Sequence, residues 1–260
     1  SGGKGKKFEL TTKTAKKGMD PSKLPWVELT GDGDFRSAEV TALRGEADIV
    51  VTNPPFSLFR EFLAWMVEGK VKFAVIGNLN AITYKDVFPL IKENKIWLGA
   101  TMGNGCQEFR VPDSHPLTSN KTRVDDEGNK YVTLPMVRWF TNIEHGCRNE
   151  TLPLMTESDN IKYSKHKQVK GVGYKKYDNY DAIEVPFVAA VPSDYPGVMG
   201  VPVSFFDKYS PEQFEIVGAT ESEGKGLSGG LWDSNSDFSQ AAVNHKKVYK
   251  RIFIRLKSVT

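Results

Sequence analysis

The tetrapeptide Asn53-Pro54-Pro55-Phe56 directly follows the apolar run 48–52, and this junction constrains the fold more than any other part of the sequence. Consecutive β-branched side chains in that run predict a buried strand of a parallel sheet. The amphipathic stretch 57–67 predicts the helix that comes next. We therefore expect the tetrapeptide at the carboxyl end of a strand, the edge at which open α/β sheets bind their ligands.

The chemistry of this tetrapeptide suits a planar NH2 group. The Asn53 amide oxygen and the Pro54 carbonyl, held rigid by Pro55, offer two neighbouring hydrogen-bond acceptors, and the Phe56 ring offers a stacking face. An adenine amino group is a poor nucleophile because its lone pair is delocalised into the ring. Two acceptors that pull on its hydrogens favour a pyramidal nitrogen that can attack an electrophilic methyl group. The alternative is a proline-bounded turn with a packed phenylalanine.

Composition excludes several classes of protein. The 260 residues can bury a substantial core, and no apolar run is long enough to span a bilayer, so we expect no membrane contact. The sequence has two cysteines and four histidines without metal-ligand spacing, which predicts neither a disulfide framework nor a metal site. No signal peptide is visible, and a reducing, cytoplasmic location is expected.

Lysines are unevenly distributed along the chain, although the net charge is only +3. Runs lie near 4–7, 13–17, 162–176 and 246–251, and tyrosines are interleaved with the third run. Lysines supply phosphate contacts and aromatic rings supply stacking, as nucleic-acid surfaces require. We expect Lys165, Lys167 and Lys170 to contact DNA, whereas the alternative for any single run is a solvated loop.

The order of elements indicates a parallel, doubly wound α/β sheet. After a hairpin of strands near 8–12 and 26–30, the predicted elements are helix 37–44, strand 48–52, helix 57–67, strand 71–76, helix 84–94 and strand 95–100. Beyond this point, strands 107–111 and 137–142 are expected to pair as an antiparallel hairpin. Further strands are expected at 201–206, 214–218 and 248–256. A change of character near residue 150 predicts a catalytic core in 1–150 and a target-recognition region in 151–260, with strands returning to the core.

Two further pairs of residues are candidates for binding. Asp34-Phe35 lies at a probable strand end, where the carboxylate can accept an exocyclic amine and the ring can cover a base; the alternative is a turn with a core phenylalanine. Trp139-Phe140 can supply a second aromatic wall for a base that has left its duplex. Ordinary strand packing explains this pair equally well, and one ring must face inward because strand residues alternate.

These segments together resemble the EcoRI-type adenine-specific DNA methyltransferases. The resemblance rests on Asp34-Phe35, on 48–56, on 137–142 and on the segments 201–209 and 211–218. It implies a Rossmann-like fold, S-adenosylmethionine as methyl donor, and methylation of adenine N6 in double-stranded DNA within a restriction-modification system. A cognate restriction endonuclease is implied without a stable complex.

The resemblance also assigns roles to individual residues. Asn53 and Pro54 would bind the target amine, Pro55 would fix the turn, and Phe56 would stack on the flipped base. Asp34 and Phe35 would hold the cofactor adenine. Family members carry upstream strands that contact the methionine and ribose of the cofactor, and nothing in residues 1–30 resembles them. We therefore expect these cofactor-binding strands to be missing from this chain.

Two other functions compete with DNA methylation. The same acceptor pair serves any planar NH2 group, so methylation of a protein glutamine amide or of an RNA base is one alternative. An inert DNA-binding fragment, without the cofactor, is the other.

Overall fold

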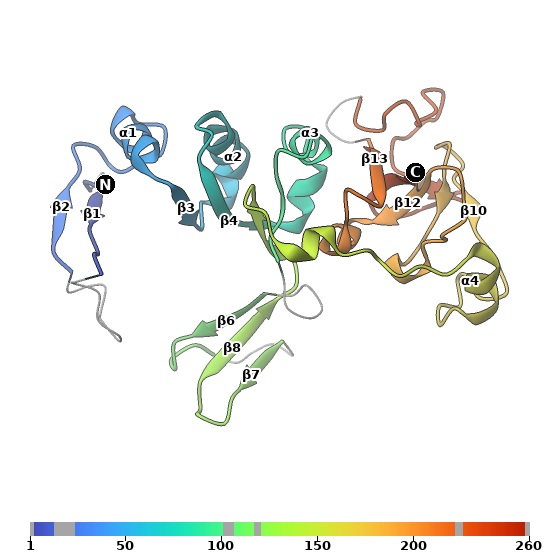
Figure 1. The fold of residues 1–260 in the computed structure, drawn as a ribbon, viewed down its shortest axis with the longest axis horizontal. Coiled ribbons are helices and arrows are strands. Elements are labelled where there is room, and N and C mark those ends of the chain that lie inside the picture. The colour runs from blue at the N-terminus through green and yellow to red at the C-terminus, as the bar shows by residue number, and fades with distance from the viewer. Residues whose placement is uncertain (1–2, 13–23, 101–106, 117–120, 222–225, 258–260) are drawn as a thin grey trace.

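The predicted strand–motif–helix unit is present in the computed structural model, which describes residues 3–12, 24–100, 107–116, 121–221 and 226–257. Strand β3 (Ile49–Thr52) runs into the tetrapeptide, the 3-10 turn η2 (Phe56–Leu58) and helix α2 (Phe59–Glu68), and β4 (Lys72–Asn78) returns parallel to β3. The molecule is a mixed α/β protein with several sheets (Figure 1).

Helix α2 lies unusually close to β4. Its apolar face buries Phe59, Phe62, Leu63 and Met66, which recur at helical spacing. A β-carbon added at Gly77 of β4 would lie 2.5 Å from the Phe59 ring, well inside van der Waals contact. Only glycine therefore permits this approach of helix and strand, and the approach fixes where α2 begins.

The main sheet has four strands in the order β3-β4-β9-β5. Strand β9 (Val137–Thr141) is antiparallel to both of its neighbours, β4 and the short β5 (Trp97–Leu98). The predicted hairpin of 107–111 with 137–142 is therefore wrong. Four of the five residues of β9 are buried, a pattern that suits a central strand rather than one half of an exposed hairpin.

Residues 107–116 and 121–134 instead contribute a separate three-stranded antiparallel sheet, which projects from the rest of the molecule (Figure 1). In this three-stranded sheet, β8 (Lys130–Leu134) lies between β6 (Gln107–Val111) and β7 (Thr122–Val124).

The C-terminal part contains a five-stranded sheet in the order β10-β11-β12-β16-β13. Strands β16 (Arg251–Leu256) and β13 (Phe214–Ala219) confirm the strands predicted near 248–256 and 214–218. The strand predicted over 201–206 ends early, because β12 stops at Pro202 and 203–208 form a 3-10 helix. Pro202 has no N–H to continue a ladder, and it begins that turn with φ −58°. The other strands here are β10 (Lys175–Lys176), β11 (Ile183–Glu184) and β12 (Met199–Pro202).

The remaining elements are short. The predicted N-terminal strand pairing is present as β1 with β2, but the first strand lies at 6–8 rather than 8–12. The predicted helix over 37–44 is confirmed as α1, capped by Ser37. The helix predicted over 84–94 is reduced to α3, which begins at Phe88 with Pro89 in its first turn, where proline is tolerated. These elements and the others not yet named are β1 (Lys6–Phe8), β2 (Trp26–Glu28), α1 (Ala38–Glu46), η3 (Leu79–Thr83), α3 (Phe88–Lys92), η4 (Gly146–Asn149), α4 (Glu157–Tyr163), η5 (Val188–Ala190), η6 (Val203–Lys208), β14 (Ala242–Val243) and β15 (Lys246–Lys247).

One continuous apolar core joins the main sheet to the C-terminal sheet. Phe73 and Phe140 of the first sheet belong to the same buried cluster as Phe205, Phe214 and Ile254 around the second. None of the described helices has the length and apolar character needed to cross a lipid bilayer.

A buried ion pair fastens β9 to η6 within this core. Arg138 donates to Asp207 through Nε (2.7 Å) and Nη2 (2.9 Å), and the two side chains are 4% and 12% exposed. The Arg138 Nη1 group donates to the carbonyls of Pro135 and Val137. All the polar groups of the guanidinium thus have partners, which a buried charge requires.

We expect Asp207→Ala to lower the free energy of unfolding by about 3–5 kcal/mol, because it leaves the Arg138 charge buried without a counterion. Urea denaturation measures the change. Glu215→Ala is the matched control, because Glu215 pairs with Arg255 on the surface, with both side chains about half exposed. The control should cost less than about 1 kcal/mol. Equal losses in the two variants would show that the buried pair is not what fastens β9 to η6.

Candidate functional site

The tetrapeptide after β3 carries two acceptors that have no hydrogen-bond partner among the described residues. Asn53 is exposed, Pro54 is buried and Phe56 is 50% exposed. Within the described part of the chain, neither the Asn53 side-chain amide nor the Pro54 carbonyl takes part in a hydrogen bond. The Pro55 carbonyl, in contrast, accepts the Leu58 N–H at 3.0 Å. Both acceptors that the sequence singles out are therefore unpaired within the described residues.

The backbone of the tetrapeptide is held in place from both sides. Buried Pro54 anchors it to the protein, and Pro55, with φ −56° and ψ 125°, begins the 3-10 turn that leads into α2. Two consecutive proline rings restrict φ at both positions, so the backbone that carries the Pro54 carbonyl keeps its geometry without a substrate. Such preorganisation is what stabilisation of developing charge requires.

The carboxyl end of β4 opens beside that of β3. The two strands are parallel, with Thr52 opposite Val75, and β4 continues three residues further, to Asn78. The Asn78 side chain caps the turn after β4 by accepting the Asn80 N–H at 2.9 Å.

A distant segment of the chain reaches the same edge. The Tyr249 hydroxyl donates to Asn80 Oδ1 at 2.9 Å, and the Lys250 ammonium donates to the Thr83 hydroxyl at 3.2 Å. Sequence reasoning placed the lysines of 246–251 in a basic run but did not bring them to this edge. No local pattern signals a contact between residues so far apart in the chain.

Asp34 already has a strong partner in the structure. Arg36 donates to Asp34 Oδ1 through its backbone N–H (2.8 Å) and Nε (2.9 Å), and to Oδ2 through Nη2 (2.6 Å). These bonds from Arg36 lower the pKa of Asp34 to about 2. The Oδ2 atom has this one partner, and the side chain is 31% exposed, so it retains a lone pair for a ligand amine.

The ring of Phe35 packs against α2. It meets Phe62 and Trp65 edge-on, with ring centroids 5.1 and 5.5 Å away. Phe35 thus joins the edge of the core and holds Asp34 beside α2.

Trp139 and Phe140 face opposite sides of the main sheet. Phe140 is buried, with its ring centroid 5.1 Å from that of Phe59. Trp139 is half-buried, pairs with Ile76 and covers Gly99 on the other side. The expectation that one ring points inward is confirmed. Trp139 lies two residues into β9 and pairs with Ile76, the residue after the partner of Thr52, so it is level with Asn53 in the sheet.

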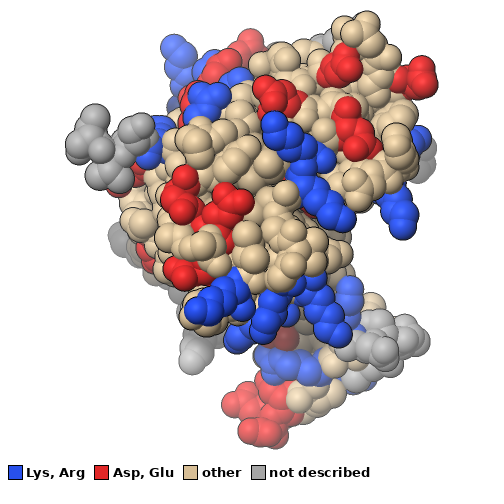
Figure 2. Space-filling model, turned by 90° about the vertical axis from the view of Figure 1, so that its right-hand side faces the viewer, with Lys and Arg blue, Asp and Glu red and all other residues tan. Residues whose placement is uncertain are grey.

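The lysines expected to contact DNA lie in the segment after α4. Lys165, Lys167 and Lys170 are exposed, and buried Val169 pins their segment to the core. Lysine and arginine side chains gather on this side of the molecule (Figure 2). A cleft of about 400 Å³ opens beside the segment, and its lining includes Gln168, Lys175, Glu184, Val248 and Arg251.

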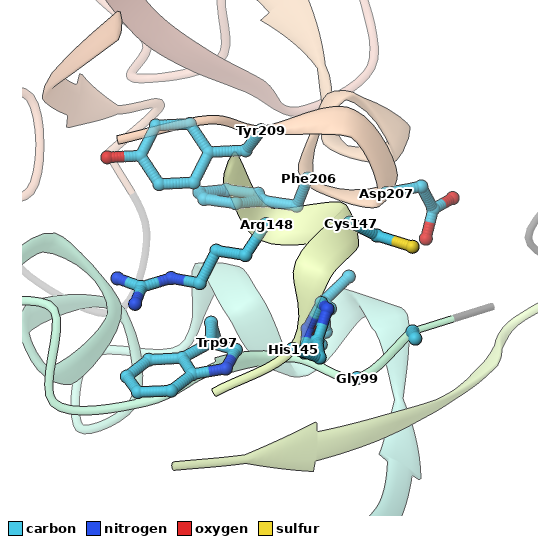
Figure 3. Close-up of a pocket in the computed structure, with 10 residues that line it drawn as sticks. Trp97, Gly99, His145, Cys147, Arg148, Phe206, Asp207 and Tyr209 are labelled. Atoms are coloured by element: carbon cyan, nitrogen blue, oxygen red, sulfur yellow. The ribbon is translucent and has the colours of Figure 1, made fainter. Parts of the chain in front are cut away.

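A second pocket lies where the main sheet meets η6 (Figure 3). There the Arg148 guanidinium lies over the Trp97 ring at 3.8 Å, and His145 Nε2 is 2.9 Å from the Leu98 carbonyl. The volume is about 40 Å³, room for only a few water molecules. This pocket is a small gap where β5, η4 and η6 pack together, and it is too small to hold a base. Among the described residues, no group of histidine, cysteine, aspartate and glutamate could hold a metal ion.

Comparison with known proteins places these features in a family. The model of the family described as "Adenine-specific methyltransferase EcoRI" matches residues 4–257. The chain is 44% identical over 227 residues to Type II methyltransferase M.EcoRI of Escherichia coli, which is 87% of this chain and 63% of that protein. It is 36% identical over 201 residues to Type II methyltransferase M.MpnI of Mycoplasma pneumoniae, covering 76% of this chain and 60% of that protein. The same values hold for Type II methyltransferase M.MgeORF184P of Mycoplasma genitalium.

The chain therefore spans about three-fifths of the length of these relatives. No solved structure matches it.

Arg36→Ala should raise the pKa of Asp34 from about 2 toward its ordinary value of 3.8, because the variant loses the donors that stabilise the carboxylate. In the parent, the stabilising effect of this carboxylate is present above about pH 4 and disappears as the pH falls toward 2. Carbon NMR of the side-chain carboxyl groups across this range measures the shift. The control is Glu61→Ala, which removes the second carboxylate bound to Arg36 and should leave the pKa of Asp34 lowered. An Asp34 pKa that stays near 2 in Arg36→Ala would contradict the assignment.

Proposed function

The chain belongs to the EcoRI family of adenine-specific methyltransferases, and on that premise we propose that it transfers a methyl group from S-adenosylmethionine to N6 of a flipped-out adenine in duplex DNA. One observation carries the proposal. At the carboxyl end of β3, the Asn53 amide and the Pro54 carbonyl are both free acceptors beside the half-exposed ring of Phe56. An adenine amino group has two hydrogens to donate and a flat face to stack.

In the proposed mechanism, Asn53 Oδ1 and the Pro54 carbonyl each accept one N6 hydrogen, and Phe56 stacks on the base. The cofactor supplies an electrophilic methyl group on a sulfonium. With its hydrogens held by Asn53 and Pro54, N6 would present its lone pair to that methyl group, and the cofactor would keep the C–S electrons as a neutral thioether. The extra N6 proton is acidic after this step and passes to water, so no strong general base is needed.

Asp34 and Phe35 would hold the adenine of the cofactor. The free lone pair of Asp34 Oδ2 suits its exocyclic amine, and Phe35 packs beside that carboxylate against α2. The Asp34 carboxylate and the Phe35 ring therefore fit the cofactor adenine, and Arg36 would remain bound to the same carboxylate.

The main sheet would form part of a Rossmann-like sheet. Within the described residues, β3 has one strand neighbour, and Ile49 and Val51 are 51% and 65% exposed. This free edge and open face suit the strands that would complete the cofactor site. In this proposal, residues 1–150 form the catalytic core, and residues 151–260 form the target-recognition region.

Duplex DNA would bind across the face that carries Lys165, Lys167 and Lys170, with Trp139 closer to the base. The relatives are named type II methyltransferases, which suggests a partner restriction endonuclease that cuts the same unmodified site. Methylation of plasmid DNA with labelled cofactor, followed by sequencing that detects modified adenines, tests the function and reveals the site.

Asn53→Ala should reduce the rate of methyl transfer by about 10²- to 10³-fold, because it removes one of two preorganised acceptors. Duplex affinity, measured by fluorescence anisotropy, should change little. Ser57→Ala is the matched control, since Ser57 is exposed immediately beyond the tetrapeptide. Turnover of Asn53→Ala within a few-fold of the parent would exclude the proposed role.

Exchange of Lys165, Lys167 and Lys170 for glutamine should weaken binding to all duplex sequences alike. The slope of log affinity against log salt concentration should become shallower by about 2–3, because each lost phosphate contact contributes about 0.9. The control is the triple exchange of Lys70, Lys72 and Lys95 for glutamine. These exposed lysines lie at or near the amino ends of β4 and β5, at the edge of the main sheet opposite to the tetrapeptide. An unchanged slope in the first variant would remove this segment from the interface.

A further inference from the structure

The three-stranded sheet of β6, β8 and β7 stands apart from the buried core of the protein. We call this sheet the arm, and Figure 1 shows it projecting from the middle of the molecule. No described side chain of its three strands is buried, and none belongs to a core cluster. The arm therefore carries out side chains that the rest of the fold does not need for its packing.

The root of the arm lies at the edge of the main sheet that carries the tetrapeptide. Strand β9, which follows the arm, begins at Val137 opposite Asn78, the last residue of β4. Because β4 is parallel to β3, this end of β4 lies at the same carboxyl edge. Trp139 pairs with Ile76 and is level with Asn53, so the root lies two residues beyond Asn53 along the strands. Across the sheet it is two strands away, about 10 Å.

Hydrogen bonds from two elements hold this root in place. The Leu79 N–H, directly after β4, donates to the Met136 carbonyl at 2.7 Å. Arg138 Nη1 donates to the Pro135 carbonyl at 2.7 Å, and Arg138 is itself fixed by its buried ion pair with Asp207. The connection between β8 and β9 is thus bonded to its surroundings, and the arm leaves the main sheet from a fixed point.

The two faces of the arm differ in chemistry. Residues that pair across neighbouring strands lie on the same face, and successive residues of one strand alternate between faces. Arg110, Tyr131 and Arg123 pair across β6, β8 and β7, so they form one row on one face. The opposite face carries the apolar side chains of Phe109, Val111, Val124 and Val132.

The row places two cations beside an aromatic ring. The Arg123 guanidinium lies over the Tyr131 ring, 4.1 Å from its centroid, and donates to the Glu108 carboxylate at 2.7 and 2.5 Å. The exposed Arg110 side chain, in contrast, has no hydrogen bond or ion pair with any described residue. A guanidinium presents a planar fork of N–H donors that fits a phosphate group. Arg110 is therefore the donor that the row offers to an anion, and Arg123 adds to the positive charge beside it.

The position of the arm favours duplex DNA as the partner of this row. Figure 1 shows the arm on the same side of the molecule as α4, and the exposed lysines 165, 167 and 170 follow α4. A duplex that presents a base to the tetrapeptide would pass along this side. Exposed Asp126 and Glu127 lie in the turn between β7 and β8, at the far end of the arm. Phosphates repel these carboxylates, so the face with the row, and not the tip, would meet the duplex.

We propose that the face of the arm with Arg110, Tyr131 and Arg123 binds backbone phosphates of the duplex beside the target adenine, on the β9 side of the tetrapeptide. This inference rests on the proposed function and gives its substrate a second contact, separate from the lysines after α4. Phosphate contacts fix the register of a duplex without reading its sequence. The arm therefore orients the DNA over the catalytic edge and does not select the site.

Single charge exchanges on the two faces of the arm test this role. Arg110→Gln removes one cation from the row. Lys130→Gln is the matched control, because Lys130 pairs with Val111 and Val124 and so lies on the opposite face. With the full chain, Arg110→Gln should make the slope of log affinity against log salt concentration shallower by about 0.9, the share of one phosphate contact. Lys130→Gln should keep the slope of the parent. Fluorescence anisotropy measures both.

Duplexes with one neutral methylphosphonate in place of a phosphate locate the contact. We expect one position among the phosphates that flank the target adenine to weaken binding of the parent but not of Arg110→Gln. The loss from both changes together should then equal the loss from either alone, as expected for two groups that contact each other. Circular dichroism reports on folding, which the exchange of an exposed, unpaired side chain should leave unchanged.

The outcomes separate this inference from the proposed function. If the parent transfers no methyl group to DNA, the proposed function fails, whatever the salt slopes are. If the parent methylates DNA and Arg110→Gln keeps the slope of the parent, or changes it no more than Lys130→Gln does, only the role of the arm is overturned. Coupling of Arg110 to a phosphate remote from the target adenine would also overturn it.

Discussion

The contact between Phe59 and Gly77 sets the position of everything around the candidate site. Because position 77 has no β-carbon, the first turn of α2 lies directly on β4, and the tetrapeptide must close the short distance between β3 and that turn. The two prolines make this connection stiff. The acceptors of Asn53 and Pro54 are therefore oriented by packing 20 or more residues away in sequence as well as by their own backbone.

Local patterns in the sequence predict the parts of the fold that are local. The run 48–52, the tetrapeptide and the helix after it are continuous in the chain, and each was expected where it lies. Strand pairing is not local. The apolar residues of 137–141 fit a hairpin or a central strand equally well, and only the space between β4 and β5 decides between them. Pro202 similarly decides how far β12 extends.

The candidate site shows the same division. Its acceptors could be found in four consecutive residues, and the structure leaves them free. The Arg36 partner of Asp34 is only two residues away, yet side-chain pairing in a turn has no fixed spacing that a sequence reveals. Tyr249 lies 169 residues from its hydrogen-bond partner Asn80, so no reading of either segment alone could join them.

The central position of β16 in the C-terminal sheet affects how the protein folds during synthesis. Strands β12 and β13 both pair with β16, and the segment 246–250, which reaches Asn80, immediately precedes it. A chain emerging from the ribosome can fold its first sheet early, but it cannot close the second one, or seat Tyr249, until residue 256 is free of the exit tunnel. A nascent chain would thus hold an unfinished sheet until β16 has emerged, and the contact with Asn80 would form only when that strand docks.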